Sequence, residues 1–181
     1  MKYQRLSIIC SLVMLGACSD DSYARFEVAG VTQYNECLAK VFPYEPYFLT
    51  ARDRQESVGI LLQSEGGGVQ GSDVLYFEIF DVAAAKAGET LAFSVPGTLD
   101  GQAIGELEVA HSCPDLRESM YLSGEIRFDE FSTEQDEMVV GELIGAGLRS
   151  IRTETEIATT LTGSWQIKVH DGQPYEEFYA N

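Results

Sequence analysis

Tyr121-Leu-Ser-Gly-Glu-Ile-Arg-Phe128 is the stretch that decides the fold class. Along it, apolar or small residues alternate with Ser123, Glu125 and Arg127. Successive side chains of a β-strand point to opposite faces, so an alternation of period two predicts a strand with one buried face. The segment 163–170 repeats this alternation, with Trp165 on its apolar side. We therefore expect a core built from half-buried strands, with Trp165 inside it.

Further strands are predicted on both sides of this stretch. The segment 138–146 is apolar with interspersed glycines, which indicates a strand that is bulged or closely approached by another backbone. Two apolar runs, at 57–63 and 73–81, flank a glycine-rich loop and predict a hairpin of buried strands. The remaining predicted elements are strands at 25–31, 47–51, 89–95 and 104–110 and one short helix at 82–87, ahead of Gly88.

These eight or nine short strands have hairpin-length connections and no long helices between them, which predicts an all-β protein. We expect an antiparallel β-sandwich, with a β-barrel as the alternative. The chain has 181 residues. After removal of an N-terminal signal this length suits one domain with its own core, and we expect that domain to span residues 25–181.

The N-terminal segment has the pattern of an export signal. Lys2 and Arg5 precede the uncharged run 6–17, which is too short to span a bilayer. The tetrapeptide Leu15-Gly16-Ala17-Cys18 resembles the lipobox of bacterial lipoproteins, in which the signal is cut before the cysteine and the cysteine is acylated. The resemblance covers about the first twenty residues. An ordinary signal peptide with an incidental cysteine is the alternative.

The resemblance implies an anchor and a location. It makes residues 1–17 a lipoprotein signal peptide, Cys18 the lipid attachment site and residues 18–24 a lipidated tether. Two or three acyl chains hold a protein firmly at a bilayer. By similarity to lipoprotein sorting rules, Ser19 after the cysteine favours the outer membrane over the inner membrane, on its periplasmic or surface face. We expect a lipid-anchored protein of the bacterial cell envelope.

The chain is strongly acidic, with 12 Lys and Arg against 29 Asp and Glu and a net charge of −17. Nucleic acid is excluded as a partner because phosphate contacts need a basic patch. The same charge opposes close contact with anionic membrane surfaces, so the lipid must supply the anchoring. A solvated, like-charged surface explains the acidity most simply, and divalent-cation binding is the alternative.

The four cysteines reduce to two in the mature chain. Cys10 leaves with the signal and Cys18 is acylated. We expect the remaining pair, Cys37 and Cys113, to form a disulfide in an oxidising envelope. The alternative is a closed zinc site, which needs about four ligands: Cys37, His111, Cys113 and His170.

The sequence lacks the complete motifs that phosphate binding and nucleophilic catalysis require. The glycine-rich segment 65–71 lacks the Gly-Lys-Ser/Thr ending of a P-loop, and a predicted strand follows it rather than a helix. The sequence has no Gly-x-Ser-x-Gly elbow. Ser112 is next to His111 in sequence, but the side chains of consecutive strand residues point to opposite faces, so the two do not form a nucleophile and base. We expect no cofactor.

Carboxylates crowd the end of the 121–128 strand and the loop after it: Glu125, Asp129, Glu130, Glu134, Asp136 and Glu137. Two of them facing one cleft could hydrolyse a glycosidic bond. However, the segment 131–137 is typical of a solvated hairpin loop and lacks the residue order of an EF-hand. Candidates for a weak calcium site are Asp129, Glu130, Glu134 and Asp136.

The proline-broken stretch Phe42-Pro-Tyr-Glu-Pro-Tyr-Phe48 is rich in aromatic residues. If exposed, Tyr44, Tyr47 and Phe48 are a candidate surface for a ligand or partner. The alternative is that the segment wraps a sheet edge with its rings packed inward.

Together these features favour a non-catalytic, lipid-anchored β-sandwich that binds or organises something at the cell envelope, such as an envelope protein or a glycan. One alternative is a carboxylate-dependent glycoside hydrolase that acts on envelope or environmental glycans. A weak calcium-binding module is the other.

Overall fold

The computed structural model describes residues 22–31, 36–64, 71–98, 101–116 and 119–170. Within them, nine strands form one antiparallel sheet in the order β1-β9-β8-β7-β6-β4-β3-β2, with β5 paired to β7. The strands are β1 (Tyr23–Val31), β2 (Phe48–Asp53), β3 (Val58–Gln63), β4 (Asp73–Ile79), β5 (Thr90–Ala92), β6 (Ala103–Val109), β7 (Met120–Glu130), β8 (Met138–Ser150) and β9 (Glu156–Lys168). The predicted all-β, antiparallel class is confirmed.

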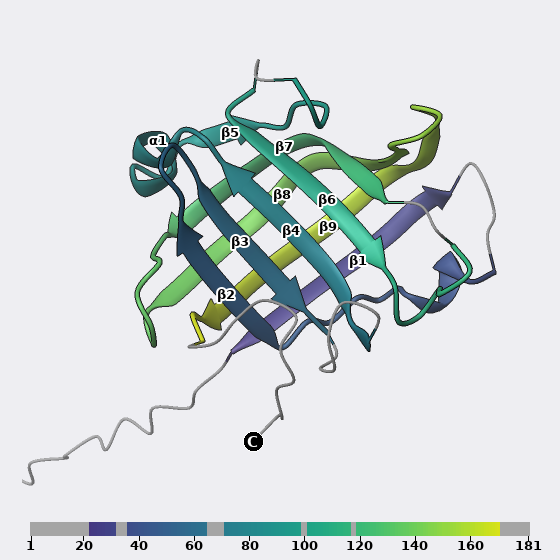
Figure 1. Ribbon diagram of the computed structural model, residues 1–181, viewed down its shortest axis with the longest axis horizontal. Coiled ribbons are helices and arrows are strands. Elements are labelled where there is room, and N and C mark those ends of the chain that lie inside the picture. The colour runs from purple at the N-terminus through teal and green to yellow at the C-terminus, as the bar shows by residue number, and fades with distance from the viewer. Residues whose placement is uncertain (1–21, 32–35, 65–70, 99–100, 117–118, 171–181) are drawn as a thin grey trace, which may run out of the picture.

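The sheet is strongly curled, so that its two halves face each other (Figure 1). β2, β3, β4 and β6 form one layer, and β7, β8, β9 and β1 form the other and cross behind them (Figure 1). The layers are joined where β6 and β7 pair over a short register, Glu106↔Tyr121 and Leu107↔Met120. The fold therefore combines the two layers of a sandwich with the single continuous sheet of a half-barrel.

The stretch that predicted the fold lies in β7, the first strand of the meander β7-β8-β9. Leu122, Ile126 and Phe128 are buried, as their alternation predicts. The register of β8 on β9 shifts between Glu142 and Ala146, which confirms the predicted irregularity of this glycine-containing strand. Gly145, inside this interval, has a φ of +57°, a left-handed backbone conformation that glycine adopts at little cost.

Trp165 is the centre of the core, as its alternation in β9 predicts, and it is fully buried. Its ring stacks on Phe26 of β1 at 5.7 Å and on Phe77 of β4 at 5.4 Å, and meets Phe128 of β7 edge-on at 5.9 Å. These partners come from both layers, so the one tryptophan of the chain holds the two halves of the sheet together. Aromatic pairs of this kind add roughly 0.5–1.5 kcal/mol each beyond their buried area.

The two edge strands are tied to other parts of the chain. On the β2 edge, the backbone N–H of His170 donates to the Leu49 carbonyl at 2.8 Å, and the His170 ring stacks on Phe48. On the β1 edge, Phe26 and Tyr44 exchange backbone hydrogen bonds at 2.8 and 2.9 Å. Paired edges of this kind present fewer unpaired N–H and C=O groups than bare ones.

Short elements connect the strands. The predicted helix is confirmed as α1 (Val82–Lys86), and its first turn is capped by Asp81, whose Oδ1 accepts from the Ala84 N–H at 3.0 Å. The single 3₁₀ turn η1 (Leu38–Lys40) follows Cys37. Among the described residues, no helix is both long and apolar enough to cross a membrane.

The predicted disulfide between Cys37 and Cys113 is confirmed, with a Cα–Cα distance of 5.6 Å. It joins the η1 turn to the segment after β6. Cysteines joined in this way cannot serve as the thiolate ligands of the alternative zinc site. The predicted signal, Cys18 and most of the glycine-rich loop lie outside the described residues, and β1 begins at Tyr23, within the predicted tether.

Candidate functional site

The outward face of β2, β3 and β4 carries a pocket of about 340 Å³. Strand register aligns two rows of side chains on this face, because every second residue of each strand points the same way. The rows are Thr50, Leu61 and Tyr76, and Arg52, Gly59 and Glu78. Arg54, which follows β2, completes the lining.

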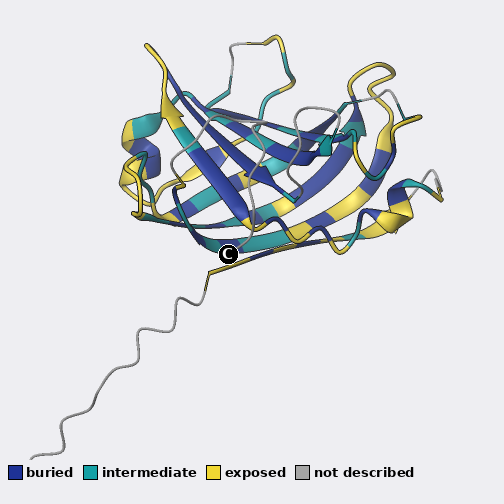
Figure 2. Ribbon diagram, turned by 60° about the horizontal axis from the view of Figure 1, so that its bottom comes forward, coloured by how far each residue is buried: buried dark blue, intermediate teal, exposed yellow. Residues whose placement is uncertain are grey.

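Gly59 is the reason that the face is hollow here. It occupies the central strand of the three, between Arg52 on one side and Glu78 on the other. A Cβ atom at this position would lie 3.2 Å from the Tyr76 hydroxyl oxygen and 3.4 Å from Arg54 Nε. All six residues of β3 are buried, on both faces of the strand, and a fully buried strand lies in the front layer of Figure 2. The pocket therefore has a closed floor beneath Gly59.

The charged groups of the pocket contact one another loosely. Arg54 Nη1 donates to Glu78 Oε1 at 3.3 Å, and Ser57 Oγ donates to the same oxygen at 2.9 Å. The guanidinium carbon of Arg54 also lies 5.6 Å from the centroid of the Tyr76 ring. Because the Arg54 side chain is 55% exposed, this ion pair contributes little to stability. It can therefore exchange for contacts with a ligand at a small loss of free energy.

Tyr76 contributes an unsatisfied hydroxyl. Burial, followed by the negative charge of Glu78, raises the pKa of Tyr76 to about 12, so the phenol is neutral at physiological pH. Among the described residues its buried hydroxyl has no hydrogen-bond partner. A buried hydroxyl without a partner costs roughly 1–3 kcal/mol. The pocket thus contains a donor that the protein itself does not use.

Glu106 extends the acidic side of this face. It lies on β6 directly across from Tyr76 in the strand register. Burial, followed by the charges of Glu108 and Glu78, raises the pKa of Glu106. The face therefore changes from basic at β2 to acidic at β4 and β6.

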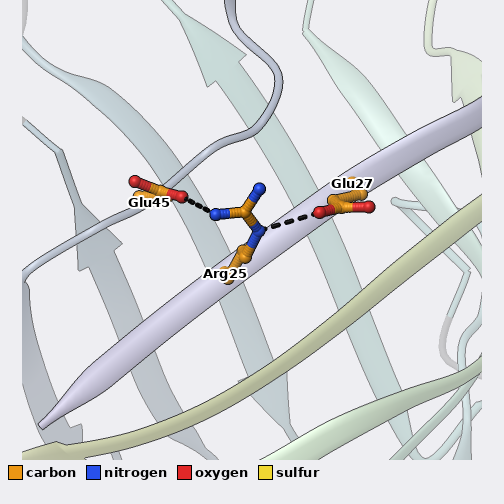
Figure 3. A network of polar contacts seen from close by, with 3 residues as sticks. All are labelled: Arg25, Glu27 and Glu45. Atoms are coloured by element: carbon orange, nitrogen blue, oxygen red, sulfur yellow. Dashed lines mark hydrogen bonds and ion pairs between the residues drawn. The ribbon is translucent and has the colours of Figure 1, made fainter.

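A second depression, of about 350 Å³, lies on the outer face of the other layer and is lined in part by Arg25, Glu27 and Glu142. Figure 3 shows Arg25 between Glu45 and Glu27, with its Nε 2.8 Å from Glu27 Oε1. Across the sheet, Arg127 pairs with Glu142 at 2.6 Å. Cations and carboxylates here neutralise one another in a largely exposed network, which is typical of a solvated surface. The β2–β4 pocket is the better candidate site.

The predicted aromatic surface is wrong for two of its three rings. Tyr44 is 2% exposed and Phe48 is 8% exposed, whereas Tyr47 is 43% exposed. The Tyr44 hydroxyl lies 2.8 Å from the carbonyl oxygens of both Leu62 and Asp73, so the ring is directed inward to satisfy buried backbone groups. The alternative interpretation, a segment wrapped on a sheet edge, describes Tyr44 and Phe48.

The acidic residues of the β7–β8 region do not build a site. Of the side chains that line the two depressions, none belongs to the set Glu125, Asp129, Glu130, Glu134, Asp136 and Glu137. In the described ranges, no three His, Cys, Asp or Glu side chains are grouped to hold a metal ion. In the described structure the calcium candidates are therefore not grouped to hold a metal ion, and the carboxylates suggested for glycoside hydrolysis line neither of the two depressions.

The pocket residues themselves were missed from sequence because they lie in runs that predict buried strands. The available signal was Gly59, since a glycine inside a strand marks a close approach or an opening. No protein-family model matches the chain, and comparison with curated proteins and with solved structures gives no match. The chemistry of the pocket is that of a site for a small polar ligand: two guanidinium groups, one carboxylate, one hydroxyl, one phenol and an apolar side chain.

Proposed function

We propose that the chain is a non-catalytic, lipid-anchored binding protein of the bacterial cell envelope, and that the β2–β4 pocket is its ligand site. The observation that carries the binding role is the combination of a hollow at Gly59 with polar groups that the protein leaves partly unused. Arg54 donates one hydrogen bond to Glu78, through Nη1, although a guanidinium has five N–H donors. The Tyr76 hydroxyl has no partner among the described residues.

The anchor is supported by the lipobox-like Leu15-Gly16-Ala17-Cys18. The disulfide between Cys37 and Cys113 agrees with an oxidising compartment such as the envelope. Because β1 begins at Tyr23, a lipid on Cys18 would hold the domain close to the membrane. The strong negative charge would then keep its surface apart from anionic lipids.

The alternative of a carboxylate-dependent glycoside hydrolase is favoured by one observation, the raised pKa of Glu106, which is caused first by burial and then by neighbouring carboxylates. A raised pKa suits a general acid. However, Glu106 is absent from the pocket lining. The carboxylate that does line it, Glu78, is paired with Arg54. Binding is therefore the better-supported function.

The anchor is tested by metabolic labelling with a fatty acid in a bacterial host. The wild-type chain should incorporate the label and Cys18→Ala should not. Cys10→Ala is the matched control and should be labelled normally, because Cys10 lies in the predicted signal. Label retained in Cys18→Ala would refute lipidation at this residue.

The binding role is tested with the full-length protein in detergent micelles on an array of envelope saccharides and peptidoglycan fragments. Gly59→Gln should abolish retention by filling the pocket, whereas Thr160→Gln, at an exposed position of β9, should leave it intact. Arg54→Ala provides a second, exposed pocket variant, and thermal melting verifies that each variant is folded. Retention that is unaffected by both pocket variants would disprove the site. Release of new reducing sugar ends would disprove a non-catalytic role.

A further inference from the structure

The β2–β4 pocket concentrates positive charge in a chain that is poor in it. Arg52 and Arg54 both line the pocket, although the whole chain has only 12 Lys and Arg against 29 Asp and Glu. A guanidinium presents a planar fork of N–H donors that matches the two oxygens of a carboxylate. Only one of the Arg54 nitrogens is bonded to Glu78. The basic side of the pocket is therefore suited to a carboxylate.

The opposite side of the pocket demands a different group. The Glu78 carboxylate can only accept hydrogen bonds when ionised, and Glu106 and Glu108 lie on the neighbouring strand of the same face. A ligand that is anionic throughout would be repelled there. An ammonium group would compete with Arg54 for the Glu78 oxygen that it already shares with Ser57. Neutral hydroxyl groups satisfy this side without either penalty.

The floor between the two sides is partly apolar. Leu61 lies at its centre and is 5% exposed, and the Tyr76 ring lies beside it in the strand register. Thr50 adds a hydroxyl next to Leu61. An apolar floor with hydroxyl-binding groups around it fits the C–H face of a sugar ring, whose O–H groups radiate from its rim.

Resting on the proposed binding function, we infer that the ligand of the β2–β4 pocket is a saccharide unit that carries a carboxylate, such as a uronic acid. Its carboxylate pairs with Arg52 and Arg54, its hydroxyls bond to Glu78 and Thr50, and its ring lies on Leu61. Movement of Arg54 toward the ligand uncovers the Tyr76 hydroxyl, which then gains a partner. At about 340 Å³, the pocket is at the small end of ligand sites and holds one or two sugar units.

The test compares two ligands that differ only at C6: methyl β-D-glucuronide, which has a carboxylate, and methyl β-D-glucoside, which has a hydroxymethyl group. Binding to the full-length protein in micelles is measured by calorimetry and by saturation-transfer NMR. The glucuronide should bind at least about tenfold more tightly, because a charge-assisted bidentate pair is lost in the glucoside. Added sodium chloride should weaken the glucuronide selectively.

Arg54→Gln should remove the preference for the glucuronide. Arg25→Gln should preserve it, and is a matched control because its side chain is 54% exposed against 55% for Arg54. Equal affinity for the two glycosides, or a preference that survives in Arg54→Gln, would overturn the inferred ligand class. If neither glycoside binds while the array ligand still depends on Gly59, the inference of an acidic sugar fails and the proposed binding function stands.

Discussion

Asp73, the first residue of β4, holds Ser112 through both of its carboxylate oxygens. Its Oδ1 accepts from the Ser112 backbone N–H at 3.0 Å and from the His111 N–H at 2.9 Å, and its Oδ2 accepts from the Ser112 hydroxyl. Asp73 is 2% exposed, and Cys113 of the disulfide follows Ser112 in the chain. The buried carboxylate therefore fixes the turn that presents Cys113 to Cys37.

Replacing Asp73 should destabilise the protein strongly. Asp73→Ala leaves two backbone N–H groups and one hydroxyl without their acceptor and should lower the free energy of unfolding by roughly 2–4 kcal/mol. Asp73→Asn retains one oxygen for the N–H groups and should lose less. Urea unfolding measures both, with Asp115→Ala, at an exposed position of the same loop, as the control. A loss no larger than that of the control would contradict this role.

Breaking the disulfide should destabilise the protein only under oxidising conditions. Cys37 and Cys113 are 76 residues apart. In the chain-entropy model, a disulfide that closes a loop of this length raises the free energy of unfolding by at most about 4.5 kcal/mol. Cys37→Ser should therefore lower the melting temperature, and Cys113→Ser should lower it equally. With reductant present, wild type and both variants should melt together. Two freely alkylated thiols in native, oxidised protein would contradict the bond itself.

Glu106 should make the protein less stable as the pH rises. Burial, followed by the charges of Glu108 and Glu78, raises its pKa above the ordinary value of 4.5 in the folded state. The folded chain therefore binds a proton more tightly than the unfolded chain, and stability falls as the pH rises from about 4.5 through the folded pKa. Glu106→Gln should melt at a higher temperature than wild type near pH 7. The gain should disappear below about pH 4.5, and a pH-independent gain would refute this origin.

A side chain at Gly141 should disturb the centre of the core. Gly141 faces Trp165 across the β8–β9 register, and a Cβ atom there would overlap the indole ring. Gly141→Ala should therefore cost roughly 1–3 kcal/mol in the free energy of unfolding and alter the fluorescence of the single tryptophan. Gly97→Ala is the control, since a Cβ at Gly97 meets no atom within 4 Å and only its positive φ is strained. An emission spectrum and a free energy of unfolding that are both unchanged in Gly141→Ala would contradict this prediction.

The sequence predicted which residues are buried better than it predicted which strands meet. Alternation of period two placed Trp165 and Phe128 in the core, because it reports the face of a strand directly. The alternation does not show which strands pair with one another. The continuity of the curled sheet through the short β6–β7 register was therefore not predicted. Tyr44 was misassigned to a candidate surface for the same reason: its inward direction depends on acceptors supplied by Leu62 and Asp73 from other strands.

The pocket depends even more strongly on which strands lie side by side and in which register. Gly59 opens a hollow only because register sets it between Arg52 and Glu78 on neighbouring strands. In sequence, the three residues lie on separate strands, and the pattern of each strand alone indicates burial or charge without a site. The disulfide was predictable because it followed from the number of cysteines and the compartment, and it required no knowledge of the strand order.

The pairing of the first strand with the last has a consequence in time. β1 pairs along its length with β9, and Phe26 of β1 packs on Trp165 of β9. A ribosome adds about 5–20 residues per second, so β1 is made on the order of ten seconds before its partner. During that interval Phe26 can pair with Tyr44, but it lacks both Trp165 and the β9 backbone. The described strand that is made first is thus completed by the one that is made last.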